Sequence, residues 1–296
     1  MADKFIVTAE EEEESKKENQ FVAVMKRVCS DKLAVAAMII FAVIVLAAVF
    51  ADVIAPYPYE EMDLGNTYQP PSWEHLCGTD QLGRDIFSRL LYGARYSLAL
   101  GLLAQIFTLF FGVVLGAIAG FFGNKVDLAV MRILDIFEAI PAILLAIIIC
   151  TALGTGFLNT VIAMGVGGIP MMSRLLRASI LTVREQEYIE AAASINCSKF
   201  RQITKYVLPN SISPLIIAFT TGIGMTIMQA ASLSYLGLGV QPPMPEWGAM
   251  LSDTRKFFQH HPFMAVFPGI AIAVTVLCIN IVGDALRDAL DPKLKD

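Results

Sequence analysis

Residues Glu190–Pro209 read EAAASINCSKFRQITKYVLP, and this stretch decides the fold. It is charged and amphipathic, and long apolar segments precede and follow it. Apolar flanks of this length indicate a membrane protein. The charged stretch between them indicates a surface on which a soluble partner docks. The sequence therefore points to one membrane subunit of a larger assembly.

The composition also favours a membrane protein. Of 296 residues, 56% are hydrophobic and only 17% are charged, whereas soluble domains average about 45–50% apolar and about 25% charged residues. The excess lies in long uncharged runs, so we predict one polytopic membrane domain. Much of the acid lies in Glu10–Glu14, and residues 1–25 are expected to form a disordered acidic cytosolic tail. We expect no nucleic-acid partner.

Six segments are long and apolar enough to cross a bilayer, which takes about 20 residues as a helix. The glycines of Leu153-Gly154-Thr155-Gly156 separate the third segment from the fourth. The fold class is therefore predicted to be all-α, with both termini on one side. The predicted spans are Leu33–Phe50, Tyr96–Asn124, Leu128–Thr151, Leu158–Met172, the segment from Pro209 to Leu236, and Phe263–Val282.

Lysine and arginine are enriched on the cytosolic side of membrane proteins, and this bias sets the orientation. With a cytosolic N-terminus, seventeen of the 22 basic residues lie inside. The prediction places Glu190–Pro209 in the cytosol between the fourth and fifth spans, and the Pro56–Arg95 loop outside. The basic residues left outside are Arg84, Arg89, Arg95, Arg255 and Lys256.

The first half of the charged stretch predicts a short helix. Residues from about Arg184 to Ser194 are compatible with a helix, because Ala191, Ala192 and Ala193 are strong helix formers. Their small side chains leave a smooth face that another surface can approach closely. Asn196 is predicted to end this helix with a positive φ, since asparagine tolerates the left-handed conformation.

The second half predicts another short helix. Ser198 is a good N-cap for Lys199–Val207, and Pro209 is expected to stop that helix. Ser213 and Pro214 are then expected to be the N-cap and first residue of the fifth span. The product is a cytosolic helix–turn–helix that is rigidly joined to the fifth span. An ordinary amphipathic interfacial helix is the alternative interpretation.

The sequence contains no Walker A motif and no Gly-Lys dipeptide at all. A transporter driven by ATP would therefore take its ATP hydrolysis from another subunit, and we expect no catalytic residue here. The histidines and cysteines show no pairing typical of a metal site, so no metal is assigned and no cofactor is expected in this chain.

Four segments together resemble one protein family. Glu190-Ala191-Ala192, Asn196 and Leu208-Pro209 resemble the EAA loop of bacterial ABC importer permeases, which usually has glycine where Asn196 stands. Three further segments are similar to the dipeptide and oligopeptide branch, and their order suits its second, C-type permease subunit. The resemblance runs from about Lys26 to Pro292. The further segments are His75–Ala94, Ala231–Gly248 and Gly283–Pro292.

The resemblance implies a type I ABC importer transmembrane domain. Residues 26–95 would form the first span and an extracytoplasmic loop. Residues 96–292 would form a five-helix permease core with the coupling loop at 184–210. The implied location is the bacterial inner membrane, which the chain would cross several times, with both termini in the cytosol. The implied partners are a second permease in a heterodimer, two cytosolic ATPases that bind ATP and Mg, and an extracytoplasmic binding protein.

The resemblance implies import of dipeptides or oligopeptides, with glutathione or nickel complexes as alternatives within the branch. An ion-coupled secondary transporter or channel is the leading alternative class. That class would be favoured by a coupling-ion site and an inverted repeat, and the halves show no clear repeat. A non-transporting membrane receptor or scaffold is a third class.

Gly112, Gly116 and Gly120 form a small-residue stripe that lets two membrane helices approach closely. The stripe fits either a contact with the partner permease or packing within the chain. Gln229 and Ser232 on the fifth span are candidates for the translocation path, and hydrogen bonding between packed helices is the alternative.

Two ion pairs are also expected. Arg132 and Asp135 are three residues apart near the cytosolic end of the third span and can pair on one helix face. In the outer loop, Arg84 lies close to Asp80 and Asp85 and suggests an ion-pair clamp. By resemblance, that loop helps to receive the binding protein.

Overall fold

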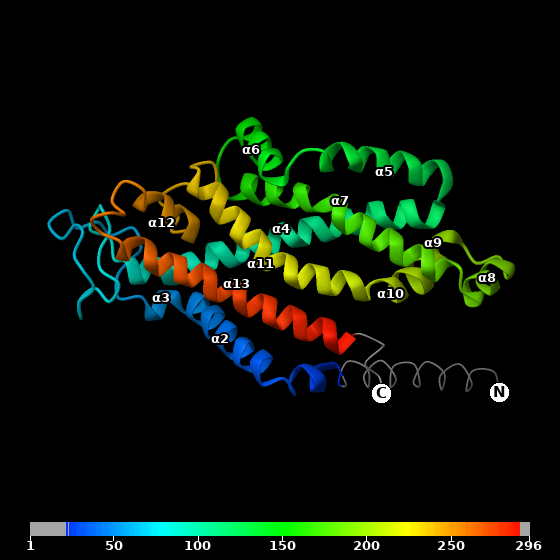
Figure 1. Ribbon diagram of the computed structural model, residues 1–296, viewed down its shortest axis with the longest axis horizontal. Helices are drawn as coiled ribbons and strands as arrows, with labels where there is room; N and C mark the ends of the chain where they lie inside the picture. The colour runs from blue at the N-terminus through cyan, green and yellow to red at the C-terminus, as the bar shows by residue number, and fades with distance from the viewer. Residues whose placement is uncertain (1–21, 23, 291–296) are drawn as a thin grey trace.

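The computed structural model describes residue 22 and residues 24–290, and this part of the chain is helical without β-strands (Figure 1). The predicted acidic tail, residues 1–25, lies almost wholly outside the described residues. The helical elements are α2 (Lys32–Val49), α3 (Ala51–Ile54), α4 (Ile86–Phe122), α5 (Asn124–Glu138), α6 (Ala142–Leu153), α7 (Phe157–Arg184), α8 (Glu187–Ser194), α9 (Lys199–Arg201), η1 (Gln202–Val207), α10 (Leu208–Ser211), α11 (Ser213–Tyr235), α12 (Trp247–Thr254) and α13 (Phe263–Leu290).

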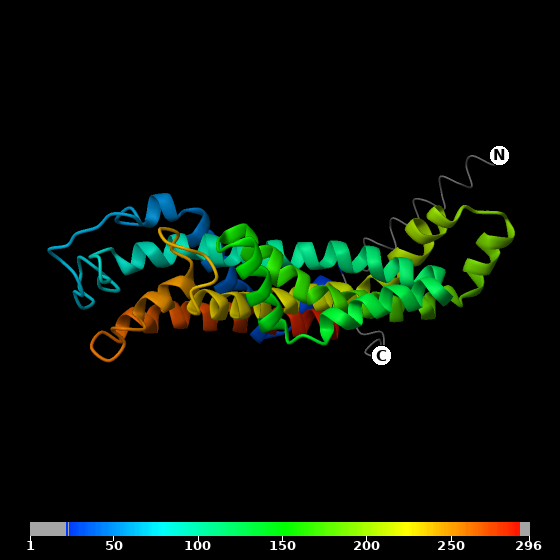
Figure 2. The same ribbon diagram turned by 90° about the horizontal axis from the view of Figure 1, so that it is seen from above.

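The long helices lie along one another in an elongated bundle (Figures 1 and 2). Within the described residues, α2, α4, α7, α11 and α13 are each long and apolar enough to span a membrane. The loop between α3 and α4 lies at one end of the bundle, and α8 lies at the opposite end. Val28 and Ala34 pack against Ala289, so the start of α2 and the end of α13 meet. The first and last helices of the described chain are therefore joined near these two ends.

Helix α4 begins at Ile86, ten residues before the predicted start of the second span at Tyr96. The Asp85 carboxylate accepts a hydrogen bond from a backbone N–H of the first turn and caps the helix. Charge does not end the helix, because Arg95 reaches across to the end of α2 and to α3. Its Nη2 donates to the Val49 carbonyl of α2 at 2.8 Å and lies 2.8 Å from an Asp52 carboxylate oxygen of α3. A charge-free run therefore underestimates the length of this helix.

The predicted third span, Leu128–Thr151, is not one continuous helix. Helices α5 and α6 are bent by 86° at a short break that contains Pro141. Proline has no N–H for the helix ladder and biases the preceding residue away from helical conformation. The pair is therefore a bent sixth crossing or a re-entrant segment.

Helix α7 continues well past Met172, where the fourth span was predicted to end, because its arginines pair with carboxylates of α5. Nε of Arg177 lies 2.5 Å from Oδ1 of Asp127. Nη2 of Arg174 lies 2.6 Å from Oδ1 of Asp135. These pairs let charged residues remain on the helix surface beside the apolar bundle.

The predicted pair between Arg132 and Asp135 is confirmed, with Nη1 and Oδ2 3.6 Å apart. Arg174 is the closer partner of Asp135 and also pairs with Glu138. The carboxylates therefore hold α5 against α7, which extends the predicted local pair to a link between two helices.

The glycine stripe packs within the chain, against α7. A side-chain carbon added at any of the three glycines would lie within 3.0 Å of an α7 atom, which is closer than real contacts allow. Glycine therefore permits the backbones of α4 and α7 to approach closely. Such a carbon would meet Met172 Cγ at 2.6 Å from Gly112, the Ser173 carbonyl oxygen at 2.6 Å from Gly116, and Ile180 Cγ2 at 2.9 Å from Gly120.

Candidate functional site

Helix α8 forms the first half of the candidate site, and Asn196 ends it as predicted, with a φ of 62°. The Asn196 N–H donates to the Ala193 carbonyl at 3.0 Å, and the Cys197 N–H donates to the Ala192 carbonyl at 3.1 Å. These two bonds form a Schellman motif, which commonly ends helices at a glycine. Asparagine therefore keeps the turn that the resembling family makes with glycine.

The second half begins at Ser198, which caps α9 as predicted by accepting a hydrogen bond from the Arg201 N–H at 3.4 Å. The helix then widens into the π-helix η1 and continues through α10. The prediction that Pro209 stops the helix is therefore wrong. Proline lacks an N–H and crowds the carbonyl four residues earlier, and a wider turn before Pro209 accommodates both effects.

The joint to α11 is also more continuous than predicted. Ile212, and not Ser213, is the N-cap, and its backbone is helical with φ −83° and ψ −20°. A helical residue at this position leaves no extended residue whose side chain could cap α11. Pro214 lies in the first turn of α11, as predicted. The chain thus passes from α10 into α11 with little change of backbone conformation.

Buried side chains fix both halves of this element to the bundle. Ile189 of α8 is 5% exposed and Val207 of η1 is fully buried. Both belong to one apolar core with Leu176 and Ile180 of α7 and Leu215 of α11. We call residues 187–211 the two-helix element. Its core connects it to two membrane helices at once.

The end of α4 contacts both the two-helix element and the end of α7 that precedes it. The Arg184 guanidinium, at the end of α7, donates to the carbonyls of Gly120 and Phe121, at 3.3 and 3.2 Å. The Lys199 ammonium lies 5.7 Å from the centre of the Phe122 ring, within the range of a cation–π interaction. The two-helix element therefore cannot move far without disturbing α4.

The predicted residues divide into two groups. Glu190, Ala191, Asn196 and Pro209 are exposed, whereas Ala192 is buried and Leu208 is half-buried against the core. The first group forms the outer face of the two-helix element, and the second fixes it to the bundle.

Sequence reasoning missed Ile195 and Phe200, which are 79% and 77% exposed beside the turn. Two large apolar side chains so far from any core indicate a contact surface. The sequence could have indicated this surface, because both apolar residues lie within a charged segment and neither shares the helix face that Ile189 and Val207 bury.

The structure separates Gln229 from Ser232. Both are exposed on α11, but only Ser232 lines a cavity of about 660 Å³ between α11 and α13. Asn280 of α13 lines the same cavity and was not predicted. Ser232 Oγ donates to the Met228 carbonyl at 2.9 Å and still has acceptor capacity toward the cavity.

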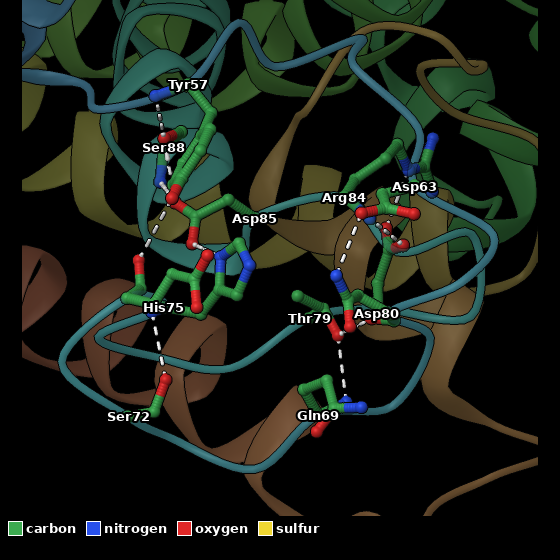
Figure 3. A network of polar contacts seen from close by, with 12 residues as sticks. Tyr57, Asp63, Gln69, Ser72, His75, Thr79, Asp80, Arg84, Asp85 and Ser88 are labelled. Carbon is green, nitrogen blue, oxygen red and sulfur yellow. Dashed lines mark hydrogen bonds and ion pairs between the residues drawn. The ribbon is translucent and has the colours of Figure 1, made fainter.

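The loop before α4 is ordered by buried charges (Figure 3). Arg84 is 3% exposed, and its Nε lies 2.6 Å from Asp80 Oδ2. Its Nη2 lies 3.4 Å from Asp253 Oδ2 of α12. The predicted clamp at Arg84 is therefore confirmed, but its second carboxylate is Asp253 and not Asp85. Gly83, with φ 72°, permits the turn because a side-chain carbon there would overlap the Asp63 carbonyl.

Asp85 has a different role, which Figure 3 also shows. One oxygen accepts hydrogen bonds from the backbone N–H and hydroxyl of Ser88, both at 2.7 Å. The other lies 3.0 Å from His75 Nδ1. Asp85 therefore connects the loop to the start of α4.

Glu246 is a buried acid that sequence reasoning missed. It is 2% exposed and caps α12, accepting hydrogen bonds from the N–H groups of Gly248 and Ala249 at 2.8 and 2.9 Å. Ser97 of α4 donates a further bond at 3.2 Å. Burial raises the pKa of the Glu246 carboxyl, and these donors oppose the rise.

A helical membrane bundle with a firmly anchored two-helix element at one end, and an ordered loop at the other, defines a transport permease subunit. The chain belongs to the binding-protein-dependent transport system inner membrane component family, whose model matches residues 112–296. Residues 19–71 match the N-terminal transmembrane domain of oligopeptide transport permease C.

Similar proteins cover nearly the whole chain. The dipeptide transport system permease protein DppC of Alkalihalophilus pseudofirmus is 45% identical over 94% of this chain and 93% of its own length. The glutathione transport system permease protein GsiD of Pectobacterium atrosepticum is 43% identical over 91% of this chain and 90% of its own length. The di/tripeptide permease DppC of Pseudomonas aeruginosa is 42% identical over 90% of each chain.

A solved structure shares the fold. An inward-facing MetNI methionine ABC transporter matches with a TM-score of 0.58 and 19% identity over 70% of this chain and 98% of that chain. This likeness supports the type I transmembrane architecture.

Proposed function

We propose that this chain is one of two permease subunits of an ATP-driven peptide importer. Its similarity to dipeptide and di/tripeptide permeases along nearly its full length supports peptides as the cargo. Glutathione, itself a tripeptide, is the second candidate because a glutathione permease is almost equally similar. Family membership favours this proposal over an ion-coupled transporter.

The two-helix element is the proposed coupling site to a cytosolic ATPase. The observation that carries this proposal is the shared core of Ile189, Val207, Leu176 and Leu215. A force applied to α8 acts on α7 and α11 together, because close-packed side chains transmit displacement. Glu190, Ala191, Ile195 and Phe200 lie on the exposed side, where an ATPase surface would contact them.

This role fixes the proposed orientation and partners. The two-helix element and both termini lie in the cytosol, and the loop before α4 lies outside. Two ATPases bind the ATP and Mg that drive the cycle. A second permease completes the pathway, and an extracytoplasmic binding protein delivers the cargo at the outer loop. The cavity beside Ser232 and Asn280 is the half of the translocation pathway that we assign to this chain. Gln229 lies on the same helix, α11, just before Ser232.

The charge reversal Glu190→Lys tests the coupling. The variant is co-expressed with both ATPases, the second permease and the binding protein, and the purified complex is reconstituted into vesicles. We expect loss of ATPase assembly or of ATP-driven dipeptide uptake. Asp288→Lys is the control, because Asp288 is an exposed acid near the end of α13 and lies outside the coupling loop. Unchanged assembly and uptake in the Glu190 variant would contradict the coupling role.

Competition identifies the cargo. Uptake of a labelled dipeptide is measured with unlabelled dipeptide, pentapeptide, glutathione or a nickel complex in excess. Inhibition by peptides alone supports the peptide assignment. Uptake of labelled glutathione that unlabelled dipeptide does not inhibit supports the second candidate.

A further inference from the structure

A polar pocket of about 720 Å³ lies at the outer end of the bundle, apart from the cavity beside Ser232. It forms where the end of α12 meets the loop before α4. Its volume falls in the range of small-molecule sites, about 300–1,000 Å³. The lining residues are Gln81, Ser252, Asp253, Arg255, Lys256 and Phe257.

One side of this pocket presents hydrogen-bond acceptors. The side-chain oxygen of Gln81 is buried, and among the described residues it has no hydrogen-bond partner. A buried acceptor left unpaired destabilises a protein, so it points to a donor that binds there. The Asp253 carboxylate lies on the same side, and Arg84 Nη2 is 3.4 Å from its Oδ2.

The Asp253 carboxyl is half-buried at this pocket. Burial raises its pKa, the Arg89 and Arg84 guanidinium groups and a hydrogen bond with Gln81 oppose that rise, and the Asp80 carboxylate adds to it. An additional cation beside Asp253 would favour its ionised form. The acceptor side of the pocket therefore suits an ammonium group, which donates three hydrogen bonds.

The lining of the same pocket also includes two cations. The Arg255 guanidinium lies 4.9 Å from the centre of the Tyr235 ring, and its Nη1 donates to the Tyr235 carbonyl at 3.3 Å. These contacts fix its position and leave other N–H groups to bind an anion. Lys256 follows directly and is exposed. These cations suit a carboxylate, and Phe257 adds an apolar group to the lining of the pocket.

We propose that this pocket binds a short peptide by its two free termini on the way to the translocation path. The terminal ammonium contacts the Gln81 oxygen and Asp253, and the terminal carboxylate contacts Arg255 and Lys256. A concave site that carries both charges fits a small zwitterion better than the flat surface of a protein. This inference rests on the proposed peptide-import function.

The test uses the assembled transporter, with its second permease and ATPases but without the binding protein. Binding of dialanine, N-acetyl-dialanine and dialanine amide is measured by titration calorimetry. We expect dialanine to bind and each blocked analogue to bind about tenfold more weakly, because each loses one charge-assisted contact.

Two variants assign the ends of the peptide. Gln81→Leu is expected to weaken dialanine binding and leave N-acetyl-dialanine unchanged. Lys256→Gln is expected to weaken dialanine and leave the amide unchanged. Lys125→Gln, an exposed lysine at the start of α5 and outside the two-helix element, serves as the control and should change neither.

Three results would overturn the proposal. Blocked and free dialanine could bind equally, or dialanine could fail to bind a transporter that imports it when the binding protein is present. Alternatively, both variants could spare dialanine binding and weaken docking of the binding protein, which would make the pocket a protein contact. Failure of the complete transporter to import any peptide would instead contradict the proposed function, and the binding titration would still report on the pocket.

Discussion

Gln105 of α4 donates a hydrogen bond from Nε2 to Thr226 Oγ1 of α11 at 2.7 Å, in the buried centre of the bundle. Gly222 makes this approach possible, because a side-chain carbon there would lie 2.8 Å from the Gln105 amide. The polar group at Thr226 therefore serves packing between helices rather than the translocation path.

Removing one partner of this bond is expected to lower the stability of the permease. Gln105→Leu or Thr226→Val alone leaves a buried polar group unpaired and costs about 1 kcal/mol. The double variant should cost less than the sum of the two single variants, because no group then remains unpaired. Thermal unfolding of the solubilised complex measures all three. Strictly additive losses would show that the bond does not couple the helices.

Asn196 provides a second test, since its φ of 62° is costly for most side chains. Asn196→Gly should preserve or slightly raise stability and keep ATP-driven uptake. Asn196→Val should destabilise the turn by about 1–2 kcal/mol or more, because a branched side chain fits the left-handed conformation poorly. Uptake and thermal unfolding are measured together. Equal behaviour of the two variants would contradict the role assigned to the turn.

The sequence was a good guide to the two-helix element where local chemistry decides the structure. Asn196 and Ser198 act on their own neighbours, so their roles could be predicted from residue type and spacing. Pro209 was mispredicted because its effect depends on whether the preceding turn can widen. Helix α4 is longer than its charge-free run because Arg95 is satisfied by Val49 of α2 and Asp52 of α3, which are distant in sequence. Contacts of that kind cannot be read from one segment.

The candidate translocation pathway likewise depends on contacts between segments that are distant in sequence. Residue type placed Gln229 and Ser232 on one span, and only the fold could show that Ser232 shares a cavity with Asn280. Likewise, Asp253 became the second carboxylate of Arg84 only through the packing of α12 on the outer loop.

The glycine stripe predicts a graded response to alanine. A methyl group at Gly116 would meet the Ser173 carbonyl oxygen at 2.6 Å, and a backbone atom cannot move aside cheaply. At Gly120 it would meet Ile180 Cγ2 at 2.9 Å, so a smaller displacement relieves the overlap. Gly116→Ala should therefore lower stability by about 1–3 kcal/mol, and Gly120→Ala by less. Yield and thermal midpoint of the purified complex report both, and the reverse order would contradict the packing.

Glu246 predicts a pH dependence of stability. Burial raises the pKa of its carboxyl above the ordinary value of 4.5. Between pH 4.5 and the pKa of the folded state, the Glu246 carboxyl therefore stays protonated in the folded protein while it ionises in the unfolded chain. The stability contributed by Glu246 is therefore complete below pH 4.5 and is lost as pH rises through the folded pKa.

Glu246→Gln cannot ionise, so its thermal midpoint should change less with pH over that window. Its absolute midpoint should be lower in acid, because an amide offers one acceptor oxygen where the acid offers two to the α12 N–H groups. Glu60→Gln, at an exposed position, should keep the wild-type slope. Parallel slopes for all three proteins would contradict the assignment to Glu246.

Ile195 and Phe200 predict where the ATPase binds. Because both are more than three-quarters exposed, Ile195→Asp and Phe200→Asp should leave the permease folded. Each should remove an apolar anchor worth about 2 kcal/mol of binding, which is about a 30-fold loss of ATPase affinity. Leu64→Asp, at a residue of similar exposure in the outer loop, should leave that affinity unchanged. Co-purification of the ATPases at limiting concentration measures the three variants. If the ATPases remained bound to both aspartate variants as tightly as to the Leu64 variant, the contact surface would have to lie elsewhere on the cytosolic end.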